Sequence, residues 1–330
     1  MINTMSPNNE EALLDVTALT VYFHTDRGVV KALDRVELSV AKGEIVGLIG
    51  ESGSGKTTIA RSILGVLPPA GKVIGGSIWF TQQDLLKLSE ARLNSDVRGK
   101  GITLIPQDPF NSLNPVFRVG TQIRDIMKWK GNGGKVSGVD EDKIIAMLEK
   151  VQIPAAADQL KKFPHQFSGG QRQRLMIAMA LLPGPDLVIA DEPTTALDVT
   201  VEAQILKLMT GLVMAGGISV LFITHDLGVA SQICKRIVVM YAGQDMEDAP
   251  AEVIFSRASH PYTRELLESL PNPEGNIRDI PGEVPSLVNP PPGCRFHPRC
   301  SRATSRCSHR APDRTAVGDR HWVRCFHPLG

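Results

Sequence analysis

The stretch that most constrains this chain is a short glycine-rich segment, Gly50-Glu51-Ser52-Gly53-Ser54-Gly55-Lys56-Thr57-Thr58. An apolar segment, 45–49, precedes it, and a segment with helical character, 59–67, follows it. In the order strand, glycine loop and helix, such a motif is typical of a phosphate-binding loop. Glycines let successive backbone N–H groups point at phosphate oxygens, and the N-terminus of the helix adds partial positive charge.

Two side chains of this loop have expected roles. Lys56 is expected to reach the outer phosphates, and Thr57 is expected to place its hydroxyl on Mg²⁺. The alternative is a glycine-rich turn that matches the motif by chance. The flanking strand and helix favour the phosphate-binding interpretation.

Length and composition limit the class of protein. A chain of 330 residues predicts about two domains, and 42% hydrophobic residues suffice for ordinary cores. The net charge is +1, so there is no general basic field for nucleic acid or an anionic membrane. The sequence has no apolar run long enough to span a bilayer. Residues 1–11 lack the pattern of a secretion signal, so we expect a cytosolic protein.

The first part of the chain alternates apolar and polar residues. We expect a disordered tail over 1–12 and antiparallel strands over 13–40, with Gly28 between them. Tyr22 and Phe23 either fill this sheet or stack on a purine ring. A strand with a turn at Gly75-Gly76 is expected over 71–80, a short helix over 84–92, and a strand that ends at Gln107.

Residues 110–182 change in character and predict a helical subdomain. Helices are expected over 119–129 and 143–151, with a flexible loop over 130–135 between them. Ser168 is positioned as the N-cap of a further helix, 172–182, with glycines at its start, which suits anions.

Two adjacent acids follow the next apolar run. Asp191 and Glu192 come directly after the expected buried strand 187–190, and ligands bind beyond the carboxyl ends of such strands. Buried neighbouring carboxylates need a partner, and Mg²⁺ would supply one for Asp191. A helix over 201–214 and strands over 219–226 and 236–240 are expected next.

These motifs occur in one order along the chain: the phosphate loop, Gln107, Ser168–Gln171, Asp191-Glu192, Leu197-Asp198 and His225. Together they resemble the nucleotide-binding domain of the ATP-binding cassette (ABC) family, over roughly residues 13–256. The resemblance implies an α/β fold with a RecA-like P-loop core, an antiparallel β subdomain and a helical signature subdomain. Phe167 stands where the family more often has leucine.

The resemblance also implies roles for single residues. Glu192 would be the general base, and His225 the switch residue near the γ-phosphate, with Lys56 and Gln107 completing the catalytic set. The implied Mg²⁺ ligands are Thr57, Gln107 and Asp191. The implied ATP contacts are Tyr22, Phe23, Gly50, Ser52, Gly53, Ser54, Gly55, Lys56, Thr57, Thr58, Gln107, Ser168, Gly169, Gly170, Gln171, Asp191 and Asp198.

In the family, the signature motif of one cassette completes the ATP site of a second cassette, packed head to tail. The resemblance therefore implies a second, homologous ATPase chain as partner, in a heterodimer. It also implies two transmembrane permease subunits and a location at the cytoplasmic face of the inner membrane.

A distinct C-terminal extension is expected after the cassette, so that the predicted domains are 13–258 and 259–330. Seven prolines between 271 and 293 exclude regular helix and predict an extended segment. Four cysteines follow, with five, six and seventeen residues between them: Cys294, Cys300, Cys307 and Cys325. Clustered thiols in a reducing compartment indicate a metal site, whereas Cys234 is expected in the core.

The spacing of the quartet does not identify the metal. Thiolates close around zinc or an iron–sulfur cluster, and nearby histidines leave mixed ligation open: His297, His309, His321 and His327. Since the extension has few large apolar residues, a metal is expected to stabilise it.

The whole chain resembles the ATPase subunits of bacterial dipeptide and oligopeptide importers, most of all their D-type subunits. The shared segments are 107–109, 112–115, 164–166, 260–263, the proline-rich stretch and the cysteine quartet. This resemblance implies a [4Fe–4S] cluster and import of di- and oligopeptides delivered by an extracytoplasmic binding protein. Nickel, antimicrobial peptides and glycosides are alternative cargoes, because the ATPase does not touch the cargo. An ABC ATPase acting on nucleic acid or ribosomes is disfavoured by the near-zero net charge.

Overall fold

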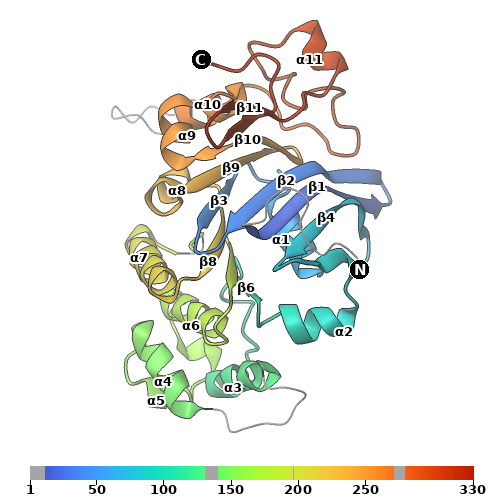
Figure 1. Ribbon diagram of the computed structural model, residues 1–330. Helices are drawn as coiled ribbons and strands as arrows, with labels where there is room; N and C mark the ends of the chain where they lie inside the picture. Colours follow the sequence, from blue (N-terminus) through green and yellow to red (C-terminus); the bar gives the residue numbers. More distant parts are fainter. Residues whose placement is uncertain (1–11, 131–139, 196, 271–278) are drawn as a thin grey trace. The chain divides into compact units, whose positions relative to one another are not determined.

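The computed structural model describes residues 12–130, 140–195, 197–270 and 279–330 (Figure 1). The chain forms two compact units, and each is described by itself. The first comprises Met1–Lys87 with Phe222–Gly330, and the second comprises Leu88–Leu221. Most of the predicted tail and of the predicted loop 130–135 lies outside the described residues. The predicted domain boundaries differ from these units and stay a prediction.

An antiparallel sheet forms the N-terminal part of the first unit. Its strands follow the order β2-β1-β4-β5, with the bounds Gly28–Ala41, Ala12–Thr25, Gly71–Phe80 and Gln83–Asp84. The predicted antiparallel pair around Gly28 is confirmed, since Thr25 pairs with Gly28 at the hairpin. The register of β1 shifts between its pairs, and inward positions such as Leu14 and Val21 are fully buried.

The turn predicted at Gly75-Gly76 is wrong, because β4 runs continuously through both residues. Gly76 instead lies opposite an irregularity of the neighbouring strand. The register of the β1–β4 pairing changes there, between Thr17 and Thr20 of β1. Gly76 has φ +90°, and a Cβ there would lie 2.5 Å from the carbonyl oxygen of Ala18. The glycine therefore lets two strands approach at a bulge.

A second sheet of the first unit follows the strand order β3-β9-β10-β12-β11. The bounds are Ile45–Ile49, Arg236–Tyr241, Gln244–Pro250, His321–Val323 and Thr315–Gly318. β3 and β9 are parallel, and their apolar runs are almost fully buried, as is expected for strands covered on both faces. The chain of β8, Ser219–Thr224, crosses the boundary between the units.

The helices of the first unit are α1, Lys56–Leu64; α8, Leu227–Ile233; α9, Ala251–Arg257; α10, Pro261–Glu268; and α11, Ser305–His309. The helix expected beyond the cassette is α10, and His260 caps it by accepting the N–H of Tyr262 on Nδ1 at 3.0 Å. The prediction that Cys234 is a core residue is confirmed, and burial raises its pKa to about 12.

The second unit contains the parallel strands β6, Ile102–Ile105, and β7, Leu187–Asp191. Its α-helices are α2 to α7: Glu90–Arg92, Val119–Lys130, Glu141–Lys150, Ala156–Gln159, Gly169–Leu181 and Val199–Gly216. The helices expected at 119–129 and 143–151 are confirmed. The helix expected over 84–92 is interrupted, since 85–87 form a 3₁₀ turn and only 90–92 are α-helical. Within the described ranges, no helix is long and apolar enough to cross a membrane.

The acidic strand β10 is buried, which its sequence did not predict. Asp245, Glu247 and Asp248 are nearly inaccessible to solvent. Glu247 accepts the N–H groups of Ser259 and His260 at 2.6 and 3.0 Å. Burial alone would raise the pKa of Glu247, but its hydrogen bonds, led by that from His321, lower it.

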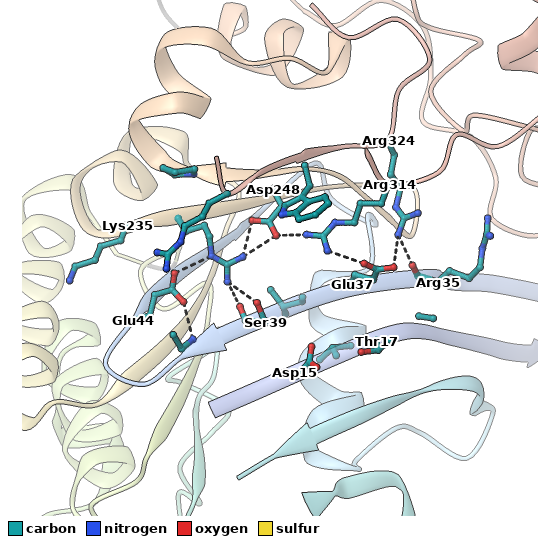
Figure 2. Close-up of a pocket in the computed structure, with 18 of the residues that line it drawn as sticks. Asp15, Thr17, Arg35, Glu37, Ser39, Glu44, Lys235, Asp248, Arg314 and Arg324 are labelled. Atoms are coloured by element: carbon teal, nitrogen blue, oxygen red, sulfur yellow. Dashed lines mark hydrogen bonds and ion pairs between the residues drawn. The ribbon is translucent and has the colours of Figure 1, made fainter. Parts of the chain in front are cut away.

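Arginines from three segments compensate Asp245 and Asp248, and Figure 2 shows Asp248 with Arg314 beside it. Arg236 of β9 binds Asp248 through two contacts of 2.8 and 2.9 Å and Glu44 at 3.0 Å. Arg314, just before β11, reaches Asp248 at 2.6 Å, and Arg324 after β12 reaches Asp245 at 3.2 Å. Arg236, Asp248, Arg314 and Arg324 line a hollow of about 980 Å³. Their ion pairs attach the hairpin of β11 and β12 to β9 and β10.

We predict that Arg236→Met destabilises the protein by roughly 3–5 kcal/mol, because it leaves buried carboxylates without their main cation. The free energy of unfolding in urea, followed by circular dichroism, measures this loss. Arg92→Ala is the control, since Arg92 pairs with Asp96 on an exposed surface. Equal losses of unfolding free energy in the two variants would show that the buried ion pairs stabilise the protein no more than an exposed pair does.

Candidate functional site

The phosphate loop has the backbone that its glycines predict. Gly50, Gly53 and Gly55 have φ values of +152°, +77° and +106°, the last at the N-terminus of α1. A Cβ at Gly50 would lie 2.1 Å from the carbonyl oxygen of Met240, whereas a Cβ at Gly53 would meet nothing within 4 Å. Gly50 is therefore required by close backbone packing, and Gly53 by conformation alone.

Polar groups converge inside this loop. Lys56 is 5% exposed, and its Nζ donates to the carbonyl oxygens of Gly50 and Glu51 at 2.7 and 3.2 Å. The Oγ of Ser54 is buried, and it makes no hydrogen bond within the described part of the chain. A buried hydroxyl and a buried ammonium group at the start of a helix fit an anion such as a phosphate group.

Other predicted residues of the first unit are placed as follows. Thr57 and Thr58 lie in the first turn of α1. His225 is exposed and directly follows β8. Tyr22 and Phe23 of β1 are half-buried, and the Phe23 ring packs on Gly71, where a Cβ would come within 2.7 Å of it. This contact gives Phe23 a packing role, and its predicted contact with adenine stays a prediction.

In the second unit, the structure brings together two residues that lie 85 positions apart. The Nε2 of Gln107 donates to Oε2 of Glu192 at 2.9 Å. Thr195 also donates to this oxygen, at 3.2 Å, a residue that the sequence analysis did not assign. Glu192 has φ +47°, an uncommon conformation for a residue other than glycine and one that occurs often at functional sites. Asp191 ends β7 and is 8% exposed.

The predicted cap of the signature helix is confirmed. The Oγ of Ser168 accepts the N–H of Gln171 at 3.3 Å, and Oε1 of Gln171 accepts the N–H of Ser168 at 3.0 Å. This reciprocal capping box fixes the start of α6. Phe167, the departure from the usual leucine, is buried.

The two glycines of the signature motif differ in how closely their neighbours pack, and Gly170 is the one without room for a side chain. A Cβ at Gly170 would lie 2.8 Å from Cγ1 of Val201, and one at Gly169 would lie 3.3 Å from the Phe110 ring. Val201 belongs to the first turn of α7, which Asp198 caps by accepting the Val201 N–H at 3.0 Å. The signature motif and the Asp198 turn are therefore packed against each other within the second unit.

All four clustered cysteines line one small cavity in the first unit. The cavity measures about 20 Å³, and its wall also contains His260, Phe296 and His327. A backbone hydrogen bond holds two of these cysteines next to each other: the N–H of Cys294 donates to the carbonyl oxygen of Cys307 at 2.8 Å. Burial, with smaller contributions from the other three thiols, raises the pKa of Cys294 to about 12. The quartet predicted from spacing is thus a spatial cluster.

This cluster is not arranged as a site for one ion. Among the residues that the structure describes, no set of three or more His, Cys, Asp or Glu side chains is placed to hold a single metal ion. A tetrahedral zinc, with Zn–S bonds of about 2.3 Å, would need its sulfurs about 3.8 Å apart.

Comparison with known proteins gives two family matches. The profile described as "ABC transporter" matches residues 33–195, and the one described as "Oligopeptide/dipeptide transporter, C-terminal region" matches residues 246–307. The second match includes three of the four clustered cysteines.

Relatives align over almost the whole chain. The oligopeptide transport ATP-binding protein OppD of Salmonella typhimurium is 43% identical and covers 99% of this chain and 97% of its own. The dipeptide transport ATP-binding proteins DppD of Bacillus subtilis and Escherichia coli are 43% and 41% identical, each over 96% of this chain and over 95% and 97% of their own.

Solved structures agree with the fold. A dimeric ATP-binding cassette in a post-hydrolysis state with ADP and Pi has a TM-score of 0.63 and 26% identity, and covers 72% of this chain and 98% of its own. The structure of cbiO1 from Clostridium perfringens has a TM-score of 0.61 and 25% identity, over 75% and 92%.

We predict that Gly50→Ala lowers the thermal unfolding midpoint much more than Gly53→Ala. The first methyl group collides with a backbone oxygen that cannot rotate away, whereas the second adds only the strain of a left-handed backbone, about 1 kcal/mol. Differential scanning calorimetry of both variants measures the difference. Equal midpoints would mean that the loop moves freely away from Met240.

Proposed function

Because the chain belongs to the ABC transporter family, in its dipeptide and oligopeptide branch, we propose that it is the ATP-hydrolysing subunit of a bacterial peptide importer. The observation that carries this proposal is the identity of 41–43% with oligopeptide and dipeptide transport ATP-binding proteins along nearly the whole chain. The match to the transporter-specific C-terminal region supports the branch, which the cassette alone would not define.

The residues that would bind the nucleotide are those of the family motifs. The N–H groups of the phosphate loop and Lys56 would hold the phosphates, and the buried Oγ of Ser54 lies in the same loop. Phe23 or Tyr22 would stack on adenine. Mg²⁺ would be held by Thr57, Gln107 and Asp191, where it neutralises charge that develops on the phosphates.

Glu192 would act as the general base. It takes a proton from a water whose oxygen forms a bond to the γ-phosphorus, while the bond from that phosphorus to the bridging oxygen of ADP breaks. The hydrogen bonds from Gln107 and Thr195 hold its carboxylate in one orientation. His225 would contact the γ-phosphate and Lys56 would stabilise the charge of the transferred group.

A second ATPase chain would complete each site. Ser168, Gly169, Gly170 and Gln171 would contribute the signature motif to the nucleotide bound by the partner. Asp198 would couple the two sites through α7, which it caps at Val201 and whose Val201 lies next to Gly170. The N-terminus of α6 is capped and rigid, which suits a contact that forms in trans. We infer a homologous partner chain, and therefore a heterodimer.

The chain would work as a peripheral subunit at the cytoplasmic face of the inner membrane, bound to two transmembrane permease subunits. Peptides would arrive through an extracytoplasmic binding protein that this chain does not contact. Nickel, antimicrobial peptides and glycosides are the alternative cargoes, and the test below separates peptides from nickel.

The cysteine cluster would hold a [4Fe–4S] cluster, with Cys294, Cys300, Cys307 and Cys325 as thiolate ligands. The observation that supports this proposal is that the four thiols line one cavity. Burial raises the pKa of the Cys294, Cys300 and Cys325 thiols, so coordination must supply the free energy of deprotonating them. When bound, the cluster would stabilise the proline-rich extension. Zn²⁺ is the alternative group.

We predict that Glu192→Gln lowers ATP turnover of the assembled transporter by at least about 100-fold, because the base is lost. Nucleotide binding should remain. In a strain that lacks the chromosomal copy, this variant should fail to restore uptake of labelled dipeptides. Glu252→Gln, on the exposed face of α9, is the control and should restore it.

Two outcomes would contradict these assignments. Undiminished hydrolysis by Glu192→Gln would remove Glu192 from the base role. Normal peptide uptake without this chain, together with a loss of nickel uptake, would replace the peptide cargo by nickel.

We predict that protein purified without oxygen is brown and contains iron and sulfide in equal amounts. Cys294→Ser or Cys325→Ser should lose both, because each removes a ligand. Cys234→Ala is the matched control, since this buried thiol lies outside the quartet. Colourless protein with one zinc would establish the alternative group and leave the ATPase assignment unchanged.

A further inference from the structure

A partly buried ion pair joins the phosphate loop to the cysteine extension. Nη1 and Nη2 of Arg299 lie 2.9 and 3.3 Å from the two carboxylate oxygens of Glu51, the second residue of the loop. The Arg299 side chain is 4% exposed and that of Glu51 is 26% exposed. Both residues belong to the first unit. A bidentate pair of this kind fixes direction as well as distance.

The extension itself holds Arg299 in place. Its Nε donates to the carbonyl oxygen of Pro281 at 2.8 Å, and its Nη2 donates to that of Ile280 at 3.1 Å. Nη1 also contacts the hydroxyl of Tyr241 at 3.3 Å. Because Arg299 directly precedes Cys300, its backbone position depends on how the cysteine segment is folded.

A second contact reaches the same loop residue from the extension. The N–H of Glu51 donates to the hydroxyl of Tyr262, a fully buried residue at the start of α10, at 3.2 Å. The Tyr262 ring packs on Tyr241 and Phe296, with centroid distances of 4.6 and 5.2 Å. Phe296 lies between Cys294 and Cys300 in sequence and lines the cysteine cavity. The backbone N–H of Glu51 is therefore bonded to a residue that packs on Phe296 of the cavity wall, and its side chain is bonded to the residue that precedes Cys300.

Glu51 places a negative charge in the loop that is expected to bind phosphates. A carboxylate in a phosphate-binding loop repels the phosphates unless a cation neutralises it, and the interaction is strong where water is scarce. Arg299 forms an ion pair with the carboxylate of Glu51, whereas Lys56 donates a hydrogen bond to the carbonyl oxygen of the same residue. Loss of Arg299 would leave a mobile negative charge at the site.

We propose that Arg299 is a positioning residue for the phosphate loop, through which the folded state of the cysteine site sets the affinity of the loop for ATP. The proposal rests on the proposed function, in that the loop binds ATP. The new element is that the C-terminal extension supports the phosphate loop and that Glu51 couples the cysteine site to this loop.

The first test is the Kd of the purified full chain for a fluorescent ATP analogue with Mg²⁺. Arg299→Ala should weaken binding roughly tenfold, as expected when one member of a buried charge pair is removed. Arg310→Ala is the matched control, because Arg310 lies in the same extension and pairs with Asp313 at the surface. Its Kd should equal that of the unmodified chain.

The second test separates coupling from general damage to the fold. Adding Glu51→Gln to Arg299→Ala removes the unpaired charge, so the double variant should bind within about threefold of the unmodified chain. Cys300→Ser should weaken binding in the unmodified chain but not in the Glu51→Gln background. If Cys300 only stabilised the fold, the changes in Kd caused by Cys300→Ser and by Glu51→Gln would be additive. If Arg299→Ala does not fold, the Cys300→Ser pair of measurements carries the test.

The outcomes distinguish this proposal from the function on which it rests. If the unmodified chain binds no nucleotide, the ATPase proposal fails. If the unmodified chain and Arg299→Ala bind with the same Kd, or Cys300→Ser weakens binding equally with and without Glu51→Gln, the coupling through Arg299 is wrong and ATP binding stands.

Discussion

Three carboxylates on β10 are buried side by side, and arginines and a histidine from other parts of the chain bind them. Arg236 comes from the neighbouring strand, whereas Arg314, His321 and Arg324 come from the last seventeen residues. Because isolated charges are costly in an interior, strand and extension each need the other to fold. The extension is thus a structural part of the first unit, and the positions of α10, the cysteine segment and the phosphate loop follow from that.

The predictable and unpredictable parts of the fold differ for a physical reason. Some elements follow from local sequence alone. The apolar runs 45–49 and 187–190 predicted β3 and β7, and the glycine pattern of the phosphate loop predicted the start of α1. The strand β10 was missed because Gln-Asp-Met-Glu-Asp has no apolar periodicity, and its burial depends on arginines up to 79 residues away. The turn at Gly75-Gly76 was mispredicted because the glycines serve a bulge in a strand more than 50 residues earlier.

The same distinction applies to the candidate site. Motif order placed Gln107, Glu192, Ser168 and the cysteine quartet, and the structure brings Gln107 to Glu192 and the four cysteines to one cavity. Thr195 and Arg299 gave no sequence signal. Each contacts a residue that the motifs already contained: Thr195 bonds to Glu192, and Arg299 forms a bidentate pair with Glu51. Partners of this kind depend on tertiary structure and lie outside any local pattern.

The burial of β10 also limits how such proteins diversify by recombination. A chimera that takes its cassette from one relative and its extension from another inherits acids from one parent and their cations from the other. Where the two sets do not match, the hybrid carries uncompensated charge in its interior even if both parents are stable. Exchange of segments should therefore succeed when the crossover lies before β9 or when both parents share this charge pattern, so that cassette and extension are inherited as one block.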